Sequence, residues 1–166
     1  MNPKQTIQHW RATERLKALA DQGWNVVFAR TAEGTMPALD YLDGTDEASD
    51  PQYGVAEGQH RRLQAQLHQV GWVGPRGLNV NQLTIFKGDD AEDGMCELRI
   101  VAFQGHRILG FLRPNKTLVL TNGFRKQSGE TPPEQKRRAR EVLRSHEGRI
   151  ARLQVITSPN SRKSKK

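Results

Sequence analysis

Basic side chains stand at the ends of short β-rich segments in the second half of the chain. Arg99 lies within one segment, Arg107 stands near the start of the next, and Arg125 and Lys126 follow the last of them. Guanidinium and ammonium groups bind phosphate and offset its negative charge, and arginine can do so through two parallel hydrogen bonds. The residue types and their places therefore point to a polyanionic ligand, of which nucleic acid is the commonest.

The net charge of +8 is unevenly spread over the 166 residues. Residues 1–60 hold five Lys and Arg against nine Asp and Glu, whereas residues 61–166 hold 21 against nine. A surface for an anionic partner is therefore expected in the second part of the chain. Charge alone fits a basic soluble protein without such a partner equally well.

Composition argues against several other classes of protein. No apolar run approaches the ~20 residues of a bilayer span, and the first residues lack the apolar stretch of a signal peptide, so we expect a cytoplasmic protein without membrane association. A single cysteine, Cys96, excludes an internal disulfide and a cysteine-based zinc finger. No metal and no cofactor is expected, because four of the five histidines lack the spacing of metal ligands. These are His9, His60, His68 and His146.

Hydrophobic periodicity, interrupted by glycine and proline, defines the elements that would position the cations. Glycines stand where two of the helices are expected to end, at Gly23 and Gly71. Residues 43–58 hold too many acids and turn formers for a core and are expected to form an exposed connection. The predicted elements are helices over 3–22, 37–44 and the stretch before Val70, a strand over 24–30, further strands over 83–86, 96–103, 106–112 and 118–122, and a C-terminal helix.

The four later strands are expected to form an antiparallel meander, because the turns at Gln104-Gly105 and Pro114-Asn115 are too short for parallel crossovers. Apolar residues on both faces of the two central strands predict a sheet that is covered at least partly on both sides.

The C-terminal helix is predicted to begin at residues 131–134 (Thr-Pro-Pro-Glu), with the threonine as N-cap, proline at the first position and glutamate completing a capping box. Its apolar positions stay in phase if Gly148 does not stop the helix. Residues 158–166 have nothing to bury and are expected to form a mobile basic tail.

Several short motifs follow one another between residues 97 and 139. They are Glu97-Leu98-Arg99, Gly105-His106-Arg107-Ile108, Thr121-Asn122-Gly123-Phe124-Arg125-Lys126, Thr131-Pro132-Pro133 and Ala139. This ordered set resembles the RelE/ParE superfamily of bacterial toxins and, within it, the HigB-like, phage-derived branch. The resemblance spans roughly residues 24–147 and is most specific between residues 96 and 133.

The resemblance implies an α+β, RelE-like fold. Its parts are a twisted, mainly antiparallel sheet with two helices on one face, a C-terminal helix and an added N-terminal helical extension. The expected limits are 1–23 for the extension, 24–157 for the toxin domain with its acidic loop at about 43–58, and 158–166 for the tail.

The resemblance also implies an activity, that of a type II toxin-like, metal-independent endoribonuclease. Such an enzyme cleaves mRNA, usually in the decoding site of the ribosome, and is held inactive by a cognate antitoxin protein. The ribose 2′-hydroxyl attacks the adjacent phosphate, so the site needs in-line geometry, cations around the phosphorane and groups that move two protons.

Individual residues receive roles from the same resemblance. Arg99 and Arg107 would clamp the scissile phosphate, and Lys126 would act beside them. Lys87 would be a general base or acid only if burial or neighbouring cations lower its pKa. His106 stands where the family has an aromatic residue, and it either transfers a proton or fills the space of a tyrosine.

A second group of residues is expected to bind RNA without taking part in the reaction, through phosphate contacts that carry no sequence selectivity. Its members are Phe124, Arg125, Lys136, Arg137 and Arg140. Each cation also has a structural explanation. Arg99 and Arg107 could form ion pairs with Glu97, Lys87 could be a solvated loop lysine, and the helix cations could form a solvated face.

Strand geometry sets a condition on this site. A strict two-residue hairpin at Gln104 and Gly105 would point Arg99 and Arg107 to opposite faces, because side chains alternate along a strand. A three-residue loop with a bulge, made by Gln104, Gly105 and His106, would put both arginines on one face.

Two other functions fit the same residues, because one fold can serve several activities. A ParE-like, non-enzymatic toxin would inhibit DNA gyrase by binding to it. A catalytically inactive RNA- or ribosome-binding module would keep the scaffold without cleaving the message.

Overall fold

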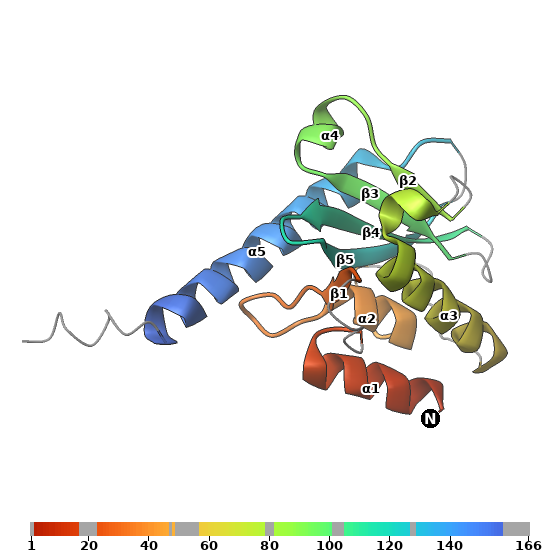
Figure 1. Ribbon diagram of the computed structural model, residues 1–166, viewed down its shortest axis with the longest axis horizontal. Helices are drawn as coiled ribbons and strands as arrows, with labels where there is room; N and C mark the ends of the chain where they lie inside the picture. Colours follow the sequence, from red (N-terminus) through yellow and green to blue (C-terminus); the bar gives the residue numbers. More distant parts are fainter. Residues whose placement is uncertain are drawn as a thin grey trace, which may run out of the picture.

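The computed structural model describes residues 2–16, 23–46, 48, 57–78, 82–100, 105–126 and 129–157, and it has a mixed α+β architecture (Figure 1). The elements are α1 (Pro3–Thr13), β1 (Asn25–Phe28), α2 (Pro37–Asp43), α3 (Glu57–Val73), the 3-10 turn η1 (Pro75–Gly77), β2 (Leu83–Ile85), α4 (Asp89–Glu92), β3 (Met95–Arg99), β4 (His106–Arg113), β5 (Thr117–Arg125) and α5 (Pro133–Thr157). Within these ranges, no helix combines the length and the apolar character that a membrane span requires.

The strands form one sheet in the order β1-β5-β4-β3-β2. Strands β2 to β5 pair antiparallel with their sequence neighbours, which confirms the predicted meander. The first strand, β1, lies beside β5 and runs parallel to it. This pairing joins the start of the chain to the end of the meander and places β5 inside the sheet.

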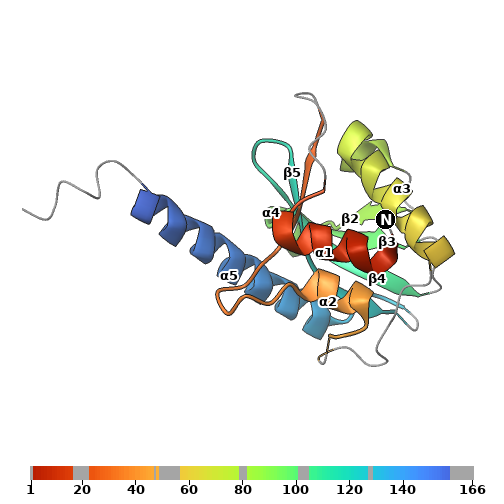
Figure 2. The ribbon, with the colours of Figure 1, turned by 90° about the horizontal axis from the view of Figure 1, so that it is seen from below.

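Helices cover both faces of the sheet, as the apolar pattern predicted (Figures 1 and 2). On one face, α1, α2 and α3 bury a core with strand residues such as Phe28 and Leu98. On the other face, α5 packs Ala139 and Leu143 against Phe111. The helix α1 belongs to the main core, because its Trp10 stacks on Phe28 with ring centroids 5.2 Å apart.

The first helix is shorter than predicted. It ends at Thr13, because Glu14 adopts a left-handed conformation with φ 60° and its N–H donates to the Trp10 carbonyl. The chain then turns back along β1, where the Leu16 N–H donates to the Val26 carbonyl at 2.9 Å. The predicted continuation over residues 17–22 lies outside the described residues.

The third helix passes Gly71, its predicted stop, and ends at Val73. The Gly71 carbonyl accepts a hydrogen bond from the Trp24 N–H, whereas the following Gly74 has φ 76°. A side chain at Gly74 would collide with the Trp24 indole, so this glycine, and not Gly71, allows the chain to turn.

The start of α5 differs from the predicted capping box. The helix begins at Pro133, and the Pro132 carbonyl accepts from the Gln135 N–H at 3.0 Å. The Thr131 hydroxyl donates to the Glu97 carboxylate on β3, so it makes a tertiary contact in place of a cap. At the other end, α5 continues through Gly148 to Thr157.

Two glycine substitutions are expected to have opposite effects on stability. Gly123→Ala places a Cβ 2.8 Å from the Tyr41 Cβ and closer still to its ring, so the free energy of unfolding should fall by about 2 kcal/mol. Gly148 lies in α5 with nothing within 4 Å of an added Cβ, so Gly148→Ala should raise it by about 0.5–1 kcal/mol. Urea unfolding of both variants measures this, and equal stability of the two would contradict the packing described.

Candidate functional site

Arg99 and Arg107 lie directly opposite each other on β3 and β4. The Ile100 N–H donates to the His106 carbonyl at 3.2 Å, so the pairing of the two strands continues just beyond Arg99. Because residues directly opposite each other on antiparallel strands point to the same face, both arginines point to the face that α5 covers. The two arginines therefore share one face, as a phosphate clamp requires, whereas Gln104 of the predicted bulge lies outside the described residues.

A buried carboxylate joins the cations of this face. Glu97 is 5% exposed, and its Oε1 lies 3.2 Å from Arg107 Nε and 3.7 Å from Lys126 Nζ. The Thr131 hydroxyl donates to the other oxygen, Oε2. Glu97 thus connects β3 to β4, to the end of β5 and to the segment before α5, and it holds Arg107 and Lys126 in place.

Arg99 completes this group, which we call the cation cluster: Arg107 and Lys126 in contact with Glu97, and Arg99 opposite Arg107 on the same face. The described residues include no carboxylate in contact with the Arg99 guanidinium, while its backbone carbonyl accepts from the Gln66 side chain. Burial and the neighbouring Arg99 charge lower the pKa of Arg107, and Glu97 opposes this shift. With three cations for one carboxylate, the cluster has an excess of positive charge that an anion can offset.

The structure places His106 on the opposite face of the sheet. Its Nδ1 is hydrogen-bonded to the hydroxyl of Tyr41 from α2, and its cross-strand neighbour is Arg125. Burial, followed by the charges of Arg125 and Arg107, lowers the pKa of His106, so the ring is neutral at neutral pH. His106 and Arg125 therefore reach the same end of the sheet as the cation cluster, but from the other side.

Lys87 is not brought to the cation cluster. It follows Phe86, whose N–H donates to the carbonyl of Met95 at the start of β3, whereas Arg99 ends that strand. Four residues of extended chain separate the two ends by about 13 Å. The upstream lysine predicted to be a proton-transfer group thus lies at the far end of the sheet.

The cations of α5 are largely neutralised by acidic residues of the same chain. Lys136 lies 2.7 Å from Asp90, and Arg140 lies 2.8 Å from Asp93 and also contacts Asp90. Arg137 is exposed and pairs along the helix with Glu141. The ion pairs with Lys136 and Arg140 lower the pKa of Asp90. These cations therefore offer RNA less charge than the sequence predicted.

Phe124, predicted to contact RNA, is 3% exposed and packs in the core beneath α5. This burial removes its ring from the surface on which a base could stack. The sequence reasoning also missed three contacts of the site, those of Tyr41, Gln66 and Thr131. Only Thr131 carried a local signal, and that signal indicated a helix cap.

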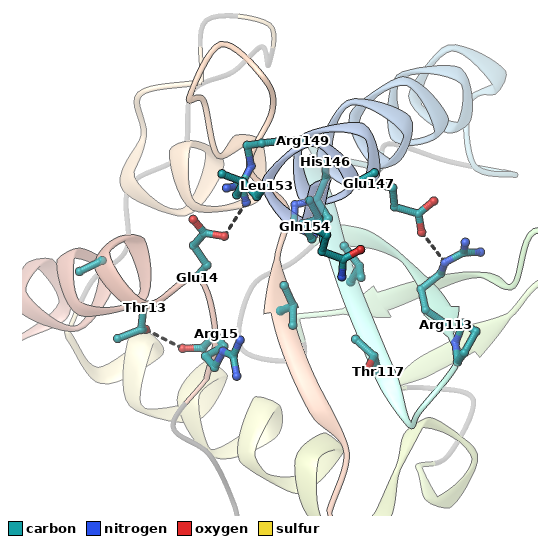
Figure 3. A pocket seen from close by; sticks show the side chains of 16 residues that line it. Thr13, Glu14, Arg15, Arg113, Thr117, His146, Glu147, Arg149, Leu153 and Gln154 are labelled. Carbon is teal, nitrogen blue, oxygen red and sulfur yellow. Dashed lines mark hydrogen bonds and ion pairs between the residues drawn. The ribbon is translucent and has the colours of Figure 1, made fainter. Parts of the chain in front are cut away.

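A cavity of about 660 Å³ lies at the other end of the sheet, between α5, β1 and the turn that joins β4 to β5 (Figure 3). Ion pairs line it: Glu14 lies 2.6 Å from Arg149, and Glu147 lies 2.6 Å from Arg113. Since Arg107 and Arg113 are at opposite ends of β4, this cavity is separate from the cation cluster.

His60 predicts a pH-dependent stability. This buried residue of α3 lies with its ring centroid 5.6 Å from that of Trp10, and among the described residues neither of its ring nitrogens has a hydrogen-bond partner. Burial lowers its pKa below the ordinary value of 6.5, so the unfolded chain binds more protons between the two values and stability falls as the pH decreases through this range. His60→Leu should reduce the loss of unfolding free energy between about pH 7 and about pH 5.

Urea unfolding at several pH values measures this dependence, with His9→Leu on the exposed face of α1 as the matched control. The same pH dependence in wild type and His60→Leu would contradict the assignment.

Metal-binding groups do not gather in the described ranges: no set of three His, Cys, Asp or Glu side chains there could hold an ion.

Comparison with known proteins gives one family. No curated protein matches the chain, but the family described as Phage derived protein Gp49-like (DUF891) matches residues 55–144, more than half of the sequence. The matched range contains Glu97 and the three cations around it. The chain therefore belongs to the Gp49-like family of phage-derived proteins, within the RelE/ParE-like toxin superfamily.

Proposed function

We propose that this protein is a toxin-like, metal-independent endoribonuclease that cleaves mRNA on the ribosome. The observation that carries the proposal is the cation cluster, in which Arg107 and Lys126 contact one buried carboxylate and Arg99 lies opposite Arg107 on the same face of the sheet. Membership in a family of RelE-type toxins supports the same reading, because such toxins are typically endoribonucleases.

In the proposed reaction the ribose 2′-hydroxyl gives its proton to solvent, its oxygen attacks the adjacent phosphorus, and the 5′-oxygen leaves with a proton, which yields a 2′,3′-cyclic phosphate and a 5′-hydroxyl. Negative charge grows on the non-bridging oxygens, and Arg99 and Arg107 are placed to share it. Lys126 is the group that can donate a proton toward the leaving oxygen. Glu97 acts as a positioning residue, because it already binds both Arg107 and Lys126.

The proposal includes partners and a cell compartment. We assign the chain to the HigB-like branch and expect it to act on mRNA in the decoding site, in the cytoplasm. The toxin–antitoxin character of the family also implies a cognate antitoxin as the protein that holds it inactive.

Primer extension on a defined message in a purified translation system tests the proposal, with EDTA-treated free RNA in parallel. We expect cuts within codons that need the ribosome and that persist in EDTA. An intact message with wild-type protein would overturn the proposal. Inhibition of gyrase supercoiling by the same sample would then indicate a ParE-like toxin.

A second candidate is an RNA- or ribosome-binding module without catalysis. It is favoured by the positions of Lys87 and His106, the two groups predicted to move protons, because Lys87 lies at the far end of the sheet and His106 lies on the opposite face from the cation cluster. Co-sedimentation with ribosomes that leaves the message intact would select this function.

A further inference from the structure

Tyr41 is a buried polar residue that lies against the end of the sheet. It comes from α2, is 1% exposed, and lies so close to Gly123 of β5 that no larger residue fits there. Its hydroxyl is hydrogen-bonded to Nδ1 of His106, with the two ring centroids 5.8 Å apart. A helix from one face of the sheet thus fixes the first residue of β4.

His106 in turn contacts Arg107 through its backbone. The His106 carbonyl accepts a hydrogen bond from Arg107 Nη1 at 3.0 Å, while Arg107 Nε lies 3.2 Å from the Glu97 carboxylate. The guanidinium is therefore held at two points, one on each side. The Glu97 contact depends on β3, and the carbonyl contact depends on the conformation of His106.

We propose that Tyr41 is a positioning residue for Arg107: it holds the His106 ring on one face of the sheet and thereby fixes the carbonyl that orients the guanidinium on the other. The proposal rests on the function argued above, in which Arg107 binds the scissile phosphate. Tyr41 precedes the range 55–144 that matches the family, so this part of the chain supplies a contact to the site from outside the matched range.

The hydrogen-bonded pair is neutral over the range in which the protein would work. Burial raises the pKa of Tyr41 and lowers that of His106, and the arginines 107 and 125 act on both groups. Asp46 is the acidic group that also acts on Tyr41. Because neither ring changes its charge near neutral pH, the contact acts as a fixed support for Arg107.

The variant Tyr41→Phe tests the proposal, because it keeps the ring on Gly123 and removes only the hydroxyl. Two-dimensional NMR of arginine Nε–H groups reports on Arg107 directly. We expect its signal to shift and its hydrogen exchange to become about tenfold faster, since the group loses one of its two supports. Thr117→Val, which removes a hydroxyl at the far end of β5, is the matched control and should leave the Arg107 signal unchanged.

Cleavage is measured separately, so the two proposals can fail separately. If the function is correct, Tyr41→Phe should cleave message up to about a hundredfold more slowly than wild type, as expected for a displaced catalytic group. An unchanged Arg107 signal in the folded variant would overturn the positioning role, whatever the cleavage rate. A wild-type protein that cleaves nothing would overturn the function, while the NMR result would still decide the structural role of Tyr41.

Discussion

Glu97→Gln is expected to lower the free energy of unfolding by about 3 kcal/mol, since removing one partner of a buried ion pair leaves the other charge uncompensated. Glu97 has side-chain exposure of 6%, and Arg107 has 11%, so water screens their 3.2 Å contact poorly. The substitution keeps the size of the side chain. The loss therefore reports on charge and not on a cavity.

Urea unfolding measures the effect, and Glu141→Gln is its matched control. Glu141 pairs with Arg137 on the solvated face of α5, where both side chains are more than half exposed, so its loss should cost less than about 1 kcal/mol. Equal effects of the two variants would contradict the buried pair.

Inorganic phosphate makes this test specific for the cation cluster. In Glu97→Gln, Arg99, Arg107 and Lys126 face one another without a carboxylate, so a bound anion should stabilise the folded state. We expect phosphate to raise the melting temperature of the variant more than that of wild type. The same increase in both proteins would show that the anion does not bind at the cluster.

The part of the site that could be predicted from the sequence is the part that strand pairing determines. Arg99 and Arg107 were placed on neighbouring strands because the punctuation around residues 104 and 105 indicates a hairpin. Their shared face depended on the length of the loop, which composition does not specify. Only the pairing of Ile100 with His106 decides it.

Contacts between distant segments could not be predicted in this way. Thr131 has the local features of a helix cap, but α5 begins two residues later, at Pro133, and the Thr131 hydroxyl donates to Glu97. Tyr41 meets His106 only because α2 crosses the end of β5 at a glycine. Lys87 was placed with the arginines by its order in the chain, but β2 runs antiparallel to β3 and carries it to the other end.

The net charge of the sequence likewise does not predict which cations are available to a ligand. The second part of the chain is strongly basic, yet Lys136 and Arg140 pair with Asp90, and Arg138 donates two hydrogen bonds of 2.9 Å to Asp46. A sum over the sequence counts these cations as available to a ligand. The structure leaves an excess of positive charge at the cation cluster, so the few residues there matter more for binding an anion than the net charge of the chain.

Arg107→Lys therefore provides the most direct test of the chemistry, because it keeps a positive charge beside Glu97 and loses the planar fork. We expect message cleavage to fall by about 100-fold to 1,000-fold, the range for removing one donor that stabilises a developing oxyanion. Stability should change little compared with Arg107→Ala, which leaves the buried carboxylate without the nearer of its two cations. Single-turnover cleavage on programmed ribosomes gives the rate, and urea unfolding gives the stability.

Arg137→Lys is the control, because Arg137 is exposed on α5 and lies outside the cation cluster. It should cleave at the wild-type rate. If Arg107→Lys also cleaved at that rate, the guanidinium would have no special role, and Arg107 would serve only to neutralise Glu97. A large loss of cleavage in Arg107→Lys with unchanged stability would instead show that the orientation of the guanidinium, set by Glu97 and His106, serves the reaction. A lysine can neutralise the carboxylate, but it cannot present two parallel donors to a phosphate.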